Sequence, residues 1–88
     1  MKYKVKFSGV LLGRDIEKTI ILNFVPAIEM RIFFYARGAQ CFPGLVESVS
    51  YHEKGKFFEV KLDFTYAQKY YSIEEKDIEA ISKLWKIR

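Results

Sequence analysis

Cysteine and histidine are almost absent from this chain of 88 residues, which contains one of each, Cys41 and His52. A single cysteine excludes an intramolecular disulfide framework, so we expect a reducing, cytoplasmic location. Metal sites usually bring three or four ligands together, and one cysteine with one histidine is too few for the common zinc sites. We therefore predict no metal and no cofactor.

Glycine and proline are also scarce, with five and two residues that fall singly between apolar segments. This pattern is typical of one domain with short loops, and residues 1–88 are predicted to form a single small α+β domain. Long apolar runs are absent, because Asn23 and Pro26 interrupt the most apolar window, at residues 19 to 28. Lysines alternate with apolar residues at the start of the chain, whereas a signal peptide needs a continuous apolar stretch. We therefore expect no membrane partner and no export signal.

Catalytic motifs are missing as well. His52 flanks a tight turn at Lys54-Gly55, where a solvent-exposed strand end is the expected role rather than a general base. A thiolate at Cys41 with His52 as its base is the catalytic alternative, and a plain loop thiol is the simpler interpretation. The glycine-rich fingerprints of nucleotide-binding loops do not occur. We expect a binding protein and not an enzyme.

Aromatic residues and a basic excess are what the chain does contain. Aromatic side chains make up 17% of the residues and hydrophobic ones 50%, which is ample for a packed core. The net charge of +4 favours polyanions, such as nucleic acid or acidic protein surfaces. Acids gather at residues 74 to 79, so the remaining surface is more basic than the total indicates.

The first half of the chain predicts strands. Residues 2 to 8 alternate between apolar side chains and lysines or serine, the pattern of a half-buried strand. Gly9 is expected to form a bulge before a turn at residues 13 to 15. A second strand is expected at about residues 18 to 25.

The segment from residue 27 to 37 satisfies two rules that disagree. Apolar residues at even positions alternate with charged and aromatic ones at odd positions, which indicates a strand. Pro26 before the segment and Gly38 after it are typical of a capped helix. We favour the strand, because a helical wheel of this segment has no clean apolar stripe.

The second half predicts a hairpin and a helix. Residues 46 to 53 and 56 to 65 form the hairpin, in the register that pairs Tyr51 with Phe58. Ser72 is expected to begin a helix through a capping box with Glu75, since apolar residues then recur at spacings of three and four. The predicted architecture is an antiparallel sheet of four or five strands with one C-terminal helix packed on one face. The alternative is ββαββα, with a helix at about residues 24 to 37.

Two groups of side chains are candidates for binding. Lys2, Lys4 and Lys6 lie along one face of the first strand, with a spacing of about 7 Å that is close to that of successive phosphates. Such lysines also protect edge strands from aggregation, and we regard that interpretation as at least equally consistent. The strand interpretation of residues 27 to 37 places the second group on one outward face: Arg31, Phe33, Tyr35 and Arg37.

These groups lead to two hypotheses about function. The first is a small non-catalytic module that binds nucleic acid, or a nucleic-acid-associated protein, through a basic and aromatic sheet face. The second is a protein–protein interaction module, such as a small inhibitor or adaptor encoded by a host, a phage or a mobile element. A homodimer through the same aromatic face is a variant of the second hypothesis.

Overall fold

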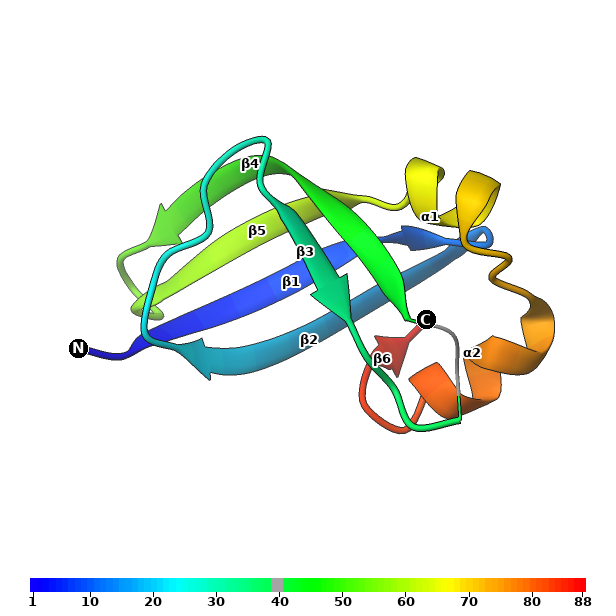
Figure 1. The fold of residues 1–88 in the computed structure, drawn as a ribbon. Coiled ribbons are helices and arrows are strands. Elements are labelled where there is room, and N and C mark those ends of the chain that lie inside the picture. The colour runs from blue at the N-terminus through cyan, green and yellow to red at the C-terminus, as the bar shows by residue number, and fades with distance from the viewer. Residues whose placement is uncertain (39–40) are drawn as a thin grey trace.

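The computed structural model describes residues 1–38 and 41–88. They form a curled, mixed sheet of six strands with two short helices (Figure 1). The elements in chain order are β1 (Tyr3–Leu11), β2 (Arg14–Leu22), β3 (Arg31–Phe34), β4 (Phe42–His52), β5 (Phe57–Asp63), α1 (Thr65–Tyr70), α2 (Glu75–Ile81) and β6 (Lys86–Ile87). The sheet order is β3-β4-β5-β1-β2-β6. The α+β class is confirmed, whereas the predicted strand number, the single helix and the wholly antiparallel sheet are wrong.

β1 lies in the middle of this sheet. It pairs with β2 in an antiparallel hairpin and with β5 in a parallel ladder. The long connection between β1 and β5 allows the parallel arrangement, which a tight hairpin would not. The curled sheet encloses one core (Figure 1).

The β1–β2 hairpin continues without a bulge through Gly9, which pairs with Ile16. It closes on Leu12 and Gly13, whose φ angles of 50° and 74° are those of a type I′ turn. The predicted bulge and the turn at residues 13 to 15 are therefore wrong. Gly9 serves packing instead, since a Cβ atom there would lie 2.6 Å from the ring of Phe64.

The β4–β5 hairpin has the predicted register, with Tyr51 opposite Phe58. Its last pair joins His52 to Phe57, so the connection contains residues 53–56 rather than only Lys54 and Gly55.

Residues 24–37 contain no helix, so the ββαββα alternative is wrong. Only Arg31–Phe34 form a strand, because the preceding residues turn at Glu29, which has a φ of 72°. Backbone bonds hold that turn against β4: Glu29 N–H donates to the Val46 carbonyl, and Val46 N–H donates to the Met30 carbonyl.

The C-terminal region contains two helices rather than one. α1 was not predicted, and α2 begins later than expected, with Glu74 as its N-cap and Asp77 as the capping-box partner. The predicted box between Ser72 and Glu75 is wrong, since Ser72 has a φ of 52° and lies outside the helix. Trp85 follows the helix but is still buried in the core.

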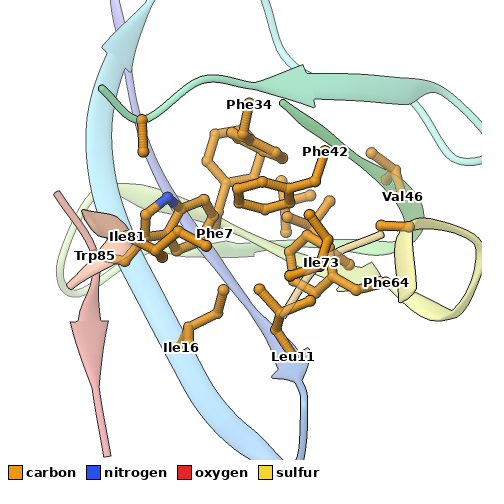
Figure 2. Packing of buried hydrophobic residues seen from close by; sticks show 14 of the residues in the cluster. Phe7, Leu11, Ile16, Phe34, Phe42, Val46, Phe64, Ile73, Ile81 and Trp85 are labelled. Carbon is orange, nitrogen blue, oxygen red and sulfur yellow. The ribbon is translucent and has the colours of Figure 1, made fainter. Parts of the chain in front are cut away.

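Aromatic rings from both ends of the chain dominate the core (Figure 2). The ring of Phe34 in β3 lies 5.4 Å from that of Phe7 in β1 and 5.0 Å from that of Trp85, measured between centroids. The inner faces of β3 and β1 therefore meet across the core. Their outer faces must point in opposite directions, and this decides how the candidate binding residues are distributed.

Candidate functional site

The outer side of β3 and the adjacent α1 carry a group of aromatic and basic side chains, here called the ring patch. Its members come from both elements and from the residues that follow each: Arg31, Phe33, Tyr35, Tyr66, Lys69, Tyr70 and Tyr71.

β3 and the residues after it supply one half of the patch. The predicted alternation is present from residue 31 onward: Phe34 is only 5% exposed, whereas Phe33 is 43% and Tyr35 72% exposed. It is wrong at Ile28, which was predicted to face inward and is 62% exposed. Arg31 and Arg37 are also exposed. β3 therefore turns one set of side chains into the core and the other outward, as its period of two requires.

α1 supplies the other half, which the sequence reasoning missed. The chain turns into this helix after β5, where the Asp63 carboxylate accepts hydrogen bonds from the Thr65 hydroxyl and backbone N–H at 2.6 and 2.9 Å. These bonds hold the pKa of Asp63 below its usual value. The Gln68 side chain also accepts a bond from Leu12 N–H, which ties α1 to the β1–β2 turn. The spacing of four between Tyr66 and Tyr70 was the available signal.

Contacts between the two halves make the patch continuous. The Arg31 guanidinium lies 4.5 Å from the centroid of the Tyr66 ring, a cation–π arrangement. The rings of Phe33 and Tyr71 are 6.1 Å apart, and those of Tyr66 and Tyr70 are 4.7 Å apart. The Lys69 ammonium lies 5.3 Å from the Tyr70 ring centroid. Two of its cations therefore lie beside tyrosine rings.

Tyr35 is the most exposed ring of the patch, with 72% exposure. A hydrogen bond with the Cys41 thiol is the largest cause that raises the pKa of Tyr35, followed by the Cys41 charge, burial and Tyr71. The ring itself stays open to solvent. Tyr70, with 60% exposure, is the second open ring.

The cations of the ring patch form no ion pairs within the described part of the chain. Among the described residues, neither Arg31 nor Lys69 forms an ion pair, and the same is true of Arg37, which follows in the next turn. Their charge is therefore available to an anionic ligand.

The lysines of β1 have a different environment. The Lys6 ammonium lies 3.3 Å from the Glu17 carboxylate of β2, which also pairs with Arg88 at 3.1 Å. Burial raises the pKa of Glu17, but the hydrogen bonds from Lys6 and Arg88 outweigh it and leave the pKa lowered. Lys4 lies 6.0 Å from the Phe57 ring centroid, and Lys2 is exposed just before the strand.

These lysines do not protect a sheet edge, because β1 is a central strand, so that interpretation is wrong. Nor do they join the ring patch. Lys4 and Lys6 project from the outer face of β1, and the contact between Phe7 and Phe34 places that face on the opposite side of the core from the outer face of β3. The predicted binding residues thus form two separate surfaces, one with the lysines of β1 and one with the arginines and rings beside β3.

The pair considered for thiolate chemistry is not assembled. Cys41 directly precedes β4 and His52 is its last residue, so the whole strand separates them. His52 instead stacks on Phe57, with centroids 4.6 Å apart. Within residues 1–38 and 41–88, no three acidic, histidine or cysteine side chains are grouped as a metal site would require. Neither described helix has the length or apolar character needed to cross a bilayer.

Comparison with known proteins gave no relatives: no family model, no curated protein and no solved structure matches this chain.

Proposed function

We propose that this protein is a non-catalytic module that binds single-stranded nucleic acid on the ring patch. One observation carries the proposal: the open rings of Tyr35 and Tyr70 lie on the same surface as Arg31 and Lys69, which have no acidic partner among the described residues. Single-strand binding sites combine these two features, rings for bases and cations for phosphates.

Each group has a defined role in this proposal. The rings of Tyr35 and Tyr70 stack on bases, and each stacked base contributes about 1–3 kcal/mol. Arg31, Arg37 and Lys69 contact phosphates. The Tyr66 ring beneath Arg31 orients the guanidinium, since the two are 4.5 Å apart.

A single strand fits this surface better than a duplex does. Stacking on a protein ring needs a base whose face is open, and duplex bases stack on one another instead. The patch also has too few cations to follow two phosphate backbones. We therefore expect a preference for unpaired strands, with little dependence on base sequence.

Fluorescence anisotropy with a labelled mixed-sequence oligonucleotide tests the proposal, with its duplex form as the comparison. Three phosphate contacts predict that log K falls with log salt with a slope of about −2, at about 0.7 per contact. Equal binding of the duplex, or no binding of either form at low salt, would contradict the proposal.

Variants of Tyr35 identify the surface involved. Tyr35→Ala removes the ring and should weaken binding by about 1–3 kcal/mol. Tyr35→Phe keeps the ring and loses only the hydroxyl, so it should bind like the wild type. If both variants bind normally, the strand contacts another surface.

A protein partner is the second candidate, and one observation favours it. The rings of Phe33, Tyr66 and Tyr71 already contact each other, so part of the patch is a preassembled aromatic surface rather than a set of open stacking platforms. Tyrosine and arginine are frequent at the energetic centre of protein interfaces. This candidate predicts that Phe33→Ala abolishes capture of a cellular protein, and that capture changes little with salt.

A further inference from the structure

β2 has a free edge beyond the short strand β6. The two-residue turn makes Leu11 and Arg14 a hydrogen-bonded pair, so the even-numbered residues of β2 bond to β1. Odd-numbered residues direct their N–H and C=O groups to the other side, where Arg88 N–H donates to the Asp15 carbonyl. β6 pairs only with Ile16 and Glu17. The backbone groups of Thr19 and Ile21 therefore face an edge with no neighbouring strand in the described chain.

A lysine without an acidic partner lies at this edge. Lys18 occupies an inward position of β2, and its ammonium lies 5.1 Å from the Trp85 ring centroid and 5.7 Å from that of Phe34. Within the described residues no carboxylate lies within ion-pair distance of it. Burial lowers the pKa of this group. A charge partly removed from water thus lies beside aromatic rings.

A groove of about 380 Å³ runs beside Lys18. Ile20 and Leu84 form its apolar part, and Lys86 adds a second ammonium. The one acid that lines it, Glu17, pairs with Lys86 at 4.0 Å and also binds Lys6 and Arg88. The groove therefore offers an apolar wall, unpaired strand groups and one cation, Lys18, that has no acidic partner among the described residues.

We infer that an extended, acidic peptide segment of a protein partner adds as a strand to the free edge of β2. Its backbone bonds to the N–H and C=O groups of Thr19 and Ile21, as in other cases of strand addition. An inward carboxylate of the peptide reaches the Lys18 ammonium. The apolar side chains two positions before and after that acidic peptide residue share its face and pack on Ile20 and Leu84. This site goes beyond the proposed function, because it uses β2 and not the ring patch.

Charge distinguishes this occupant from a second copy of the chain. A symmetric dimer through this edge would pair residues 18–22 of one copy with the same residues of the other. This segment contains Lys18 and no acid. Pairing two copies would therefore bring cations together without a counter-ion, whereas an acidic peptide provides the missing charge.

Two synthetic peptides test the inference: acetyl-Thr-Val-Thr-Glu-Thr-Val-Thr-amide, and the same peptide with glutamine in place of glutamate. Titration into ¹⁵N-labelled protein should shift the amide signals of Thr19 and Ile21 and slow their hydrogen exchange. The glutamate peptide should bind about tenfold more tightly, as expected for one partly buried charge pair. Equal binding of the two peptides, or shifts confined to β3, would overturn the inference.

Protein variants separate the charge pair with Lys18 from the backbone pairing along β2. Lys18→Gln should remove the preference for glutamate, while Lys83→Gln, a change at an exposed lysine in the turn after α2, should preserve it. Ile21→Pro should abolish binding of both peptides without unfolding the protein, because the lost N–H faces the free edge. Full binding by a folded Ile21→Pro variant would overturn the strand addition. A dimer in sedimentation that the glutamate peptide does not dissociate would show that a second copy takes the edge.

Discussion

The outer faces of β1 and β3 differ in a way that the alternation of their side chains does not reveal. Both faces carry cations, Lys4 and Lys6 on β1 and Arg31 on β3. β1 has a strand on each side, and acids from both neighbours are near Lys6: Glu17 forms the ion pair, and Glu59 is its register partner in β5. β3 has only β4 beside it, which places Leu45 opposite Arg31 and Pro43 opposite Phe33.

The number of neighbouring strands therefore affects the chance that a cation in this sheet meets an acid. A side chain on a central strand has cross-strand partners on two sides, and one acid among them is enough to neutralise a lysine. A side chain on an edge strand has partners on one side only. Arg31 on β3 keeps its charge for this reason, and Lys6 on β1 loses part of its charge.

The largest expected effect is on the free energy of unfolding, and it concerns Phe34, whose ring packs between the inner faces of β3 and β1. Phe34→Ala removes the ring that joins β3 to Phe7 and Trp85, and should lower the free energy of unfolding by about 3–5 kcal/mol. Phe33→Ala changes the next residue, which faces outward, and should cost less than about 1 kcal/mol. Urea denaturation measures both. Equal losses would mean that Phe33 is part of the core.

Next in size is the loss of a cation from the ring patch. Arg31→Gln should reduce the salt slope for single-stranded nucleic acid by about 0.7, the share of one phosphate contact. Anisotropy at several salt concentrations measures this slope. An unchanged slope would show that Arg31 serves only to pack on Tyr66.

The reverse experiment removes the acid that neutralises β1. Glu17→Gln frees Lys6, and weak, salt-sensitive binding of polyanions to the β1 face should increase a few-fold. The variant should also alter the response to acid. The lowered pKa of Glu17 means that its stabilising effect is present above the ordinary glutamate pKa and is lost as the pH falls through the lower folded value. Thermal unfolding against pH should therefore be flatter in the variant over that range.

The smallest effect is expected for Lys4→Gln, on the β1 face. Binding of single-stranded nucleic acid should change by less than about twofold, and stability by less than about 0.5 kcal/mol, as for most surface substitutions. The same anisotropy and denaturation measurements apply. A loss as large as that of Arg31→Gln would mean that one ligand contacts both sides of the molecule.

Local patterns predicted much of the fold. The alternation at residues 2 to 8, the register of the β4–β5 hairpin and the outward set at Arg31, Phe33, Tyr35 and Arg37 all have a period of two, which a strand imposes on its own side chains. The type I′ turn at Leu12 and Gly13 was missed. Leucine rarely adopts a positive φ, so the residue type did not indicate that turn.

Half of the candidate site, the tyrosines of α1, could not be predicted from such patterns. α1 is short, has no acid in its first turn and is tied to the rest of the fold by the bond that Gln68 accepts from Leu12 N–H. Its tyrosines therefore join the patch through tertiary contacts. The lysines of β1 were identified as a surface, but their acidic partner lies on a different strand, and no spacing in the sequence shows which strands are neighbours.

By itself, the sequence determined which side chains of β1 and β3 face the core and which face outward, because the pleat alternates them whatever the neighbours are. It did not do so for β2, where Lys18 faces inward and Ile21 outward. Only the tertiary structure decided which outward sets meet. The order of the strands and the curl of the sheet put the lysines of β1 and the rings beside β3 on opposite sides of the core, left β3 and β2 as open edges, and brought α1 beside Phe33. These are consequences of long-range packing, and packing depends on the whole set of core contacts at once.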